Sequence, residues 1–297
     1  MKFTKYKWLY FLFSALVILP GIYSLIRFGL KLSVDFTGGS ILELKFKKDI
    51  KIQRYEDIRK IIEEKKFEVI SIQSSGEGQI LIRLKPITKE DVSIIKAALA
   101  DKFEEMPQEV RFETVGPILG KELIKKTIFA IILAAGFIMF YVARQFKDLM
   151  FGTCAILAML HDALVMLGTF SLLGHFFGVE VDTLFVTAML TILSFSVHDT
   201  VVVYDRIRES QKKFPKTNFV DLVDKAVTET LSRSINNSMT IIFMLISLWL
   251  LGGSTIRWFA FALLIGTISG TYSSTFTAAP LLVVWDSFQK KKSTSSF

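Results

Sequence analysis

The sequence predicts an α-helical integral membrane protein with six transmembrane helices and an α+β domain of ferredoxin-like fold between the first and second of them. Hydrophobic residues make up 51% of the 297-residue chain, and they gather into six runs that each approach the roughly 20 residues needed to cross a bilayer. The stretch 31–120 has no such run and carries sixteen Lys/Arg and sixteen Asp/Glu. We therefore expect a water-soluble domain at 31–120 within a membrane protein.

The first apolar run, 8–26, follows a segment with three lysines and no acidic residue. This arrangement begins like a secretory signal, but the run exceeds the roughly 7 to 15 residues of a signal core and no A-x-A type cleavage site follows. We expect residues 1–30 to form a cytoplasmic N-terminus and an uncleaved first transmembrane helix.

Residues 31–120 show alternating strand and helix patterns. Alternation of apolar residues predicts strands, apolar residues three and four apart predict helices, and the turn-like segment 74–78 predicts a hairpin. The expected elements are a strand at 40–46, a helix at 55–65, strands at 69–73 and 79–84, a helix that Thr88 caps together with Asp91, and a strand at 109–115. This order is that of the ferredoxin-like, split βαβ fold.

Five more apolar runs follow within 121–286, before an expected cytoplasmic tail at 287–297. They cover roughly 123–143, 149–173, 182–204, 235–251 and 258–285. Positive charge concentrates in every second connection, and 205–234, expected as a cytoplasmic loop, holds seven Lys/Arg. The positive-inside rule then places both termini and this loop in the cytoplasm and the domain 31–120 outside it.

Three neighbouring apolar runs carry ionisable residues. Asp199 follows His198 in one run, Asp162 follows His161 in the run before it, and Arg233 opens the run after it. An ionised carboxylate in hydrocarbon costs about 2.5 to 3.5 kcal/mol even on the lenient insertion scale. Groups of this kind predict an ion or proton pathway inside a membrane protein.

Asp199 is expected roughly 8 Å inside the cytoplasmic boundary of its span. Arg233, at the cytoplasmic start of the next span, is long enough to reach it. One interpretation is a structural ion pair, or two groups that both extend to the interface. The other is a carboxyl group that alternates between a protonated state and an ionised state paired with Arg233.

Asp162 is expected deeper, roughly 20 Å from the inner side. Its span contains no arginine, so this group is expected either to be neutral or to face a hydrated, protein-lined interior. Because adjacent residues on a helix point about 100° apart, we do not expect His161 and Asp162 to act together as a dyad.

The sequence does not predict an enzyme. A nucleophile elbow, a Walker loop and an H-E-x-x-H motif are all missing from it, so no catalytic residue is expected. A single cysteine, Cys154, and three histidines offer no clustered ligands, so neither a metal nor another cofactor is expected. The net charge of +8 is spread along loop ends and does not predict nucleic-acid binding.

Two pairs of glycines stand out. Gly266 and Gly270 have the spacing of closely packed membrane helices, although glycine is common in such helices anyway. Gly38 and Gly39 follow Asp35 where the chain leaves the first span, and a hinge and a plain turn both fit there.

Seven short motifs, in the right order, resemble the SecD/SecF family of bacterial protein-export membrane proteins, which belongs to the resistance-nodulation-division superfamily. They are VDFTGG at 34–39, VGP at 115–117, HD at 161–162, DTVVVYDRIRE at 199–209, SRS at 232–234, LGG at 251–253 and GTYSS at 270–274.

The resemblance implies an extracytoplasmic domain between the first two of six helices and pairing with SecD, a second six-helix subunit. It also implies that the pair assists the SecYEG channel and SecA and uses the proton gradient to drive late stages of the translocation of exported unfolded polypeptide. In the family, the residues matching Asp199 and Arg233 are implicated in proton coupling. His198 stands where relatives often have asparagine, which adds a titratable group, and Asn237 stands where some have threonine.

Two other classes stay open: half of a proton-coupled small-molecule or lipid exporter of the same superfamily, and a structural membrane scaffold. The small domain and the motif at 34–39 favour the export subunits. Asp162 and Asp199 need an enclosed interior, which six helices alone supply poorly. We therefore expect obligate pairing with a homologous six-helix partner through spans three to six.

Overall fold

The computed structural model describes residues 2–47, 54–76, 78–146 and 148–294. The chain divides into two compact units, a membrane unit of Met1–Lys31 with Ala130–Phe297 and a small unit of Leu32–Phe129. Each unit has its own hydrophobic core.

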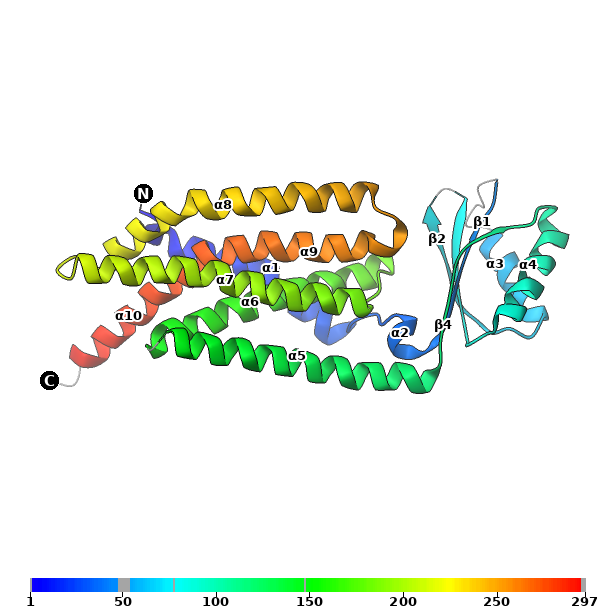
Figure 1. The fold of residues 1–297 in the computed structure, drawn as a ribbon, viewed down its shortest axis with the longest axis horizontal. Helices are drawn as coiled ribbons and strands as arrows, with labels where there is room; N and C mark the ends of the chain where they lie inside the picture. The colour runs from blue at the N-terminus through cyan, green and yellow to red at the C-terminus, as the bar shows by residue number, and fades with distance from the viewer. Residues whose placement is uncertain (1, 48–53, 77, 147, 295–297) are drawn as a thin grey trace. The chain divides into compact units, whose positions relative to one another are not determined.

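The small unit is built on a four-stranded antiparallel sheet with the strand order β2-β3-β1-β4 (Figure 1). Two helices, α3 and α4, cover one face of this sheet, and the single turn α2 precedes β1. The elements are α2 (Val34–Thr37), β1 (Gly39–Lys45), α3 (Tyr55–Glu64), β2 (Val69–Gly76), β3 (Gln79–Leu84), α4 (Lys89–Phe103) and β4 (Gln108–Val115). The predicted order of strands and helices is confirmed, and it is the split βαβ order.

Strand alternation and one helix cap account for much of this unit. Leu42 and Ile82 face each other in β1 and β3 and are fully buried with Ile95 of α4, so one side of each strand supplies the core. At the start of α4 the side chain of Thr88 accepts a hydrogen bond from the backbone of Asp91, whose carboxylate accepts one from the backbone of Thr88 at 2.8 Å. This capping box confirms the predicted helix start.

Six helices in the described part of the chain are long and apolar enough to cross a membrane, as predicted. After the short 3₁₀ turn η1 (Phe3–Tyr6), the first five are α1 (Lys7–Arg27), α5 (Pro117–Gln145), α6 (Leu149–Phe177), α7 (Thr183–Lys213) and α8 (Phe219–Leu251). The sixth span consists of α9 (Ser254–Ser273), the π-helical segment η3 (Ser274–Ala278) and α10 (Ala279–Thr294).

The segment 205–234, expected as a loop, is helical over most of its length. Helix α7 continues to Lys213 and α8 begins at Phe219, so the charged residues mark helix extensions beyond the apolar runs. Asn218 caps α8 by accepting a hydrogen bond from the backbone of Val220 at 3.2 Å. Arg206 of α7 and Glu229 of α8 join the two extensions at 2.6 Å. Charged residues on facing helix extensions therefore form a helical hairpin here. The hydropathy pattern alone does not distinguish such a hairpin from a loop.

Helices α1 and α6 run parallel, with contacts at a constant sequence offset. The hydroxyls of Ser24 and Ser171 lie 2.7 Å apart, with an offset of 147 residues. The same offset relates Gly21 to Gly168, where a Cβ built on Gly168 would lie 2.6 Å from Gly21 Cα. The helices therefore touch backbone to backbone at this point, as small residues allow in membranes.

Replacing Gly168 with valine is expected to lower the free energy of unfolding by about 1 to 3 kcal/mol, because the new side chain overlaps the α1 backbone. The control is Gly136→Val in α5, where a Cβ meets no atom within 4 Å. Thermal unfolding of the two purified variants checks this, and equal midpoints would contradict the close contact between α1 and α6.

Candidate functional site

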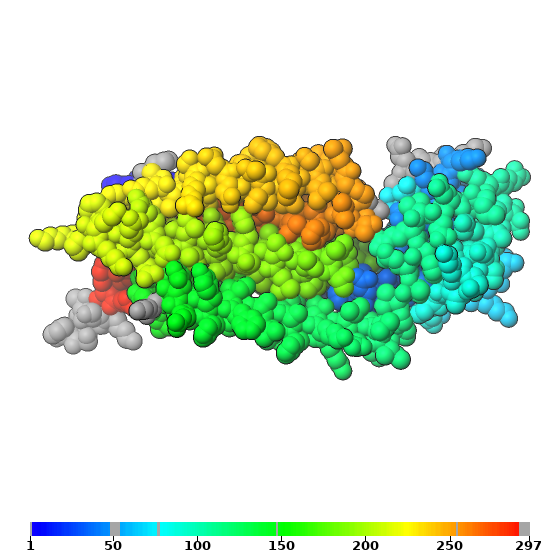
Figure 2. All heavy atoms as spheres, in the orientation of Figure 1, coloured from blue at the N-terminus to red at the C-terminus, as the bar shows by residue number. Residues whose placement is uncertain are grey.

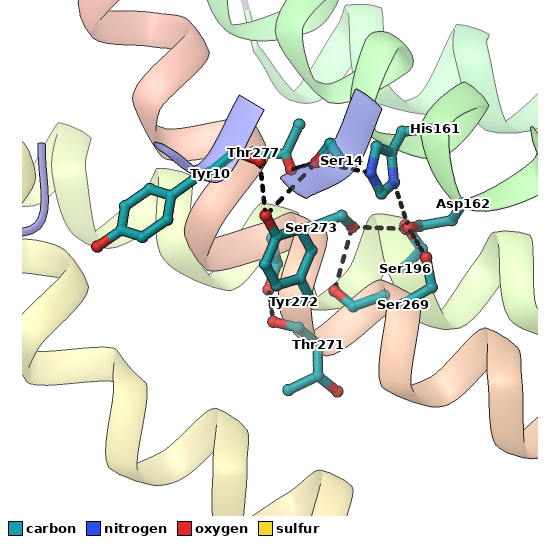
Figure 3. A network of polar contacts seen from close by, with 12 residues as sticks. Tyr10, Ser14, His161, Asp162, Ser196, Ser269, Thr271, Tyr272, Ser273 and Thr277 are labelled. Atoms are coloured by element: carbon teal, nitrogen blue, oxygen red, sulfur yellow. Dashed lines mark hydrogen bonds and ion pairs between the residues drawn. The ribbon is translucent and has the colours of Figure 1, made fainter. Parts of the chain in front are cut away.

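Asp162 of α6 has no exposed surface and is held by four polar groups (Figure 3). Ser269 of α9 donates to its Oδ1 at 2.6 Å, and Ser196 of α7 and Ser273 of α9 donate to its Oδ2 at 2.5 and 2.6 Å. Nδ1 of His161 lies 3.0 Å from Oδ1. A buried carboxylate must replace the hydrogen bonds that it loses to water. Groups from three helices do so here.

The prediction that His161 and Asp162 do not act together is wrong. The imidazole is buried, and besides contacting the carboxylate through Nδ1 it lies 3.0 Å from Ser14 Oγ of α1 through Nε2. The expected divergence of about 100° concerns the directions in which adjacent side chains leave the helix. The ring nitrogens lie two rotatable bonds further out and reach back to the neighbouring carboxylate.

Asp199 of α7 is 7% exposed and forms a second buried carboxylate site. The hydroxyl of Ser234 on α8 lies 2.8 and 2.7 Å from its two carboxylate oxygens, and Ser274 donates to Oδ2 at 2.5 Å. Asp199 thus joins α7 to α8 and to the sixth span through hydroxyl groups.

The predicted pairing of Asp199 with Arg233 is not present. Arg233 is exposed on α8, and among the described residues no ion pair joins it to Asp199. Arg233 and Ser234 are adjacent, so their side chains leave the helix about 100° apart. Because Ser234 faces Asp199, Arg233 is turned to the outer surface.

The sixth span supplies donors to both carboxylates. Ser269 and Ser273, four residues apart on one helix face, reach Asp162, and the next residue, Ser274, reaches Asp199. Gly266 of the same helix packs tightly on α7, since a Cβ there would overlap Ile192 Cγ1. The predicted close packing of this helix is therefore confirmed.

The serine donors lie where the sixth span changes from α-helix to π-helix. Ser274 opens the π-helical segment η3, and Tyr204 of α7 donates to the backbone oxygen of Ala278 at its other end at 2.9 Å. Segments of π-helix occur frequently at functional sites. Sequence reasoning missed the serines, although the spacing of Ser269 and Ser273 on one face of a span with buried partners was the available signal.

His198 does not join the Asp199 site. Its side chain is exposed and borders a hollow of about 360 Å³ between α5 and α7, which Tyr141 and Val201 also line. Figure 2 shows α5 (green) and α7 (yellow-green) side by side on one face of the membrane unit. Adjacent positions on α7 thus place the carboxylate inside and the imidazole outside.

Asp35, Gly38 and Gly39 form a tight turn in the small unit. Asp35 lies in α2, where its backbone N–H donates to Ser33 Oγ at 3.2 Å. Gly38 and Gly39 have φ angles of +74° and +137°, and a Cβ on Gly38 would lie 2.7 Å from the backbone of Pro117. Only glycine fits there without strain, because both the backbone conformation and the space demand it.

The described part of the chain has six membrane-length helices, and the last four spans hold two hydroxyl-bound carboxylates between them. These features define a multi-pass membrane protein with ionisable groups in its helical interior. A family model described as protein export membrane protein SecD/SecF, C-terminal, matches residues 94–287, and one described as the SecD/SecF GG motif matches residues 23–50. The chain belongs to the SecD/SecF family of protein export membrane proteins.

Similar proteins agree with this membership. Protein translocase subunit SecF of Thermobaculum terrenum is 41% identical over 95% of the chain and 93% of the relative, and that of Anaerolinea thermophila is 37% identical over 95% and 92%. The crystal structure of SecDF from Thermus thermophilus matches with a TM-score of 0.85 and 32% identity, over 97% of this chain and 39% of that one.

Proposed function

We propose that this chain is the Sec protein-export subunit that, together with SecD, uses the proton gradient to drive late stages of polypeptide translocation across the inner membrane. In this role it works with the SecYEG channel and SecA and catalyses no chemical reaction. The single observation that carries the proposal is the pair of buried carboxylates. Among the described residues, neither Asp162 nor Asp199 has a lysine or arginine within 4.0 Å.

Hydroxyl groups suit a carboxyl group that changes its protonation state. A serine hydroxyl donates to an ionised carboxylate and can accept from a protonated one. The donors around Asp199, Ser234 and Ser274, can therefore serve both states after a rotation of their O–H bonds. A fixed lysine or arginine partner would instead favour one state permanently.

The energies match. A proton that crosses the membrane releases about 2.3 kcal/mol per 100 mV, and one hydrogen bond to a charged group is worth about 1.5 to 3 kcal/mol. Protonation of Asp199 weakens its bonds to Ser234 of α8 and Ser274 of the sixth span. One proton can thus shift the contacts that hold three helices together.

The remaining site residues have supporting roles in this proposal. Arg233 is exposed here and pairs with Asp199 in a second state of the cycle, after α8 turns. His198 adds a titratable group on the outer side of the same α7 turn. Asp35, Gly38 and Gly39 form the motif from which motion of the outer domain starts, as a hinge.

The orientation follows the positive-inside rule. Both termini and the hairpin at 205–234 lie in the cytoplasm, and the domain 31–120 lies outside. Spans three to six contact the six-helix SecD partner, because His198 leaves a polar group on the exposed face of α7 that hydrocarbon would not solvate.

Export by vesicles that contain this chain and its SecD partner tests the proposal. We expect an imposed proton gradient to increase the amount of polypeptide translocated through SecYEG, and a protonophore or omission of this chain to remove the increase. If the intact complex translocates equal amounts of polypeptide with and without the gradient, a structural scaffold is favoured. Proton-driven efflux of small molecules without polypeptide export would favour an exporter.

A further inference from the structure

A chain of hydrogen bonds leads away from Asp162 to the first span (Figure 3). His161 bridges Asp162 Oδ1 and Ser14 Oγ, with 3.0 Å on each side. Ser14 Oγ in turn lies 3.4 Å from Thr277 Oγ1 and 3.5 Å from Tyr272 Oη. Tyr272 is partly exposed, so the chain connects a fully buried carboxylate to a residue at the surface of the membrane unit.

Ser14 has more partners than hydrogens. Its one hydroxyl hydrogen can go to His161 Nε2, to Thr277 or to Tyr272, but to one of them at a time. Tyr272 already donates to the backbone oxygen of Tyr10 at 2.8 Å, so it accepts from Ser14. The direction of the hydrogen bonds is therefore not fixed, and it must change when the imidazole changes tautomer.

Both tautomers of His161 fit the geometry. With the hydrogen on Nδ1, the ring donates to an ionised Asp162 and accepts from Ser14. With the hydrogen on Nε2, the ring donates to Ser14, which donates to Tyr272, and Nδ1 accepts from a protonated Asp162. The two arrangements differ by one proton on the carboxyl group.

We propose that His161 and Ser14 are the proton relay through which Asp162 exchanges its proton with water, which makes the first span part of the proton pathway. This inference deepens the proposed function and rests on it. Imidazole transfers protons in this way because it can accept at one nitrogen and release at the other.

The transfers balance. The O–H bond of Ser14 breaks as an N–H bond forms at Nε2 of His161, and the N–H bond at Nδ1 breaks as an O–H bond forms on Asp162. The imidazole is neutral before and after. For the next step the O–H bond of Tyr272 turns from the backbone oxygen of Tyr10 toward Ser14 and breaks as its proton passes to the Ser14 oxygen. A hydronium ion then restores the Tyr272 hydroxyl. One proton has moved from water to Asp162.

Charged or titratable groups that face His161 in the described part of the chain come from two helices. Asp162 contacts it on its own helix, and the Tyr272 ring of α9 is stacked on it with centroids 6.2 Å apart. From α1 it meets only the hydroxyl of Ser14 among the hydrogen bonds of the described residues. The relay therefore needs Ser14 more than any other group on the first span.

Ser24 provides the matched control. It lies on the same face of α1, is fully buried, and bonds to Ser171 of α6 at the offset of 147 residues that also relates Ser14 to His161. Ser171 passes its hydrogen to the backbone oxygen of Gly29 at 2.7 Å. This second pair has no titratable member, so it holds the two helices together without moving a proton.

The test uses the full chain with its SecD partner in lipid vesicles and follows the infrared C=O band of a protonated carboxyl after a pH jump. The band of Asp162 is the one that Asp162→Asn removes. We expect Ser14→Ala to slow its appearance roughly a hundredfold or more, since the low end for loss of a positioned proton-transfer group is about a hundredfold. Ser14→Thr is expected to restore the rate, and Ser24→Ala to leave it unchanged.

An unchanged rate in Ser14→Ala would overturn the relay, and so would equal slowing in Ser14→Ala and Ser24→Ala, which would indicate a packing role. If Ser14→Ala does not fold, His161→Asn replaces it with the same expected slowing, and normal kinetics in that variant would overturn the relay. A wild-type complex in which no band depends on Asp162 would overturn it as well. Gradient-driven export, measured separately, shows whether the proposed function falls with it.

Discussion

Asp199→Asn is expected to abolish stimulation of polypeptide export by a proton gradient while the protein stays inserted and paired. Asparagine keeps the shape of the side chain and a hydrogen-bond acceptor for Ser234 and Ser274, but it cannot take up a proton in this range of pH. The helices around position 199 therefore remain together, and the change of charge is lost. The measurement is export with and without the gradient in vesicles of the complex.

Asp221→Asn is the matched control, because this aspartate is exposed at the start of α8 and its loss removes the same formal charge. It is expected to leave the stimulation intact. Full stimulation in Asp199→Asn would remove Asp199 from the mechanism. A loss in both variants would point instead to the overall charge of the cytoplasmic side.

Asp162→Leu is expected to lower the free energy of unfolding by about 2 to 5 kcal/mol, because it leaves buried donors without their acceptor. The hydroxyls of Ser196, Ser269 and Ser273 and one imidazole nitrogen all point at this carboxylate. The leucine side chain is larger than that of aspartate, so no cavity forms, and overpacking adds to the loss of hydrogen bonds. Denaturation of the purified protein in mixed detergent measures it.

Asp162→Asn separates hydrogen bonding from charge at the same position. Its amide oxygen still accepts from serine hydroxyls, so we expect a loss of stability clearly smaller than that of the leucine variant. Equal stability of the leucine variant and the wild-type protein would contradict the arrangement of donors around Asp162.

The six spans and the order of the small sheet could be predicted because each depends on local patterns. Apolar runs mark membrane helices wherever they pack, and alternation in β1 and β3 reports a sheet with one buried face. The burial of Asp162 and Asp199 could also be anticipated, because a carboxylate within an apolar run is costly to expose to lipid and therefore faces the interior of the helix bundle.

The partners of these carboxylates could not be predicted. Serines are neutral in hydropathy and common in membrane helices, so Ser234 and Ser274 carry no signal without the helix rotations that aim them. The long side chain of Arg233 made it the expected partner of Asp199, yet one residue of helical rotation decided in favour of Ser234. The prediction that His161 and Asp162 do not act together failed for a similar reason, because the direction of Cβ does not fix the position of a ring nitrogen.

In the proposed mechanism, the carboxyl group of Asp199 gains and loses a proton within the helical interior. Solid-state NMR of the complex in lipid, with ¹³C-labelled aspartate carboxyl groups, observes this directly, and Asp199→Asn identifies the resonance. We expect this resonance to move between its ionised and protonated positions as the pH changes across the range in which the gradient drives export. A resonance that stays at one position throughout that range would contradict the mechanism.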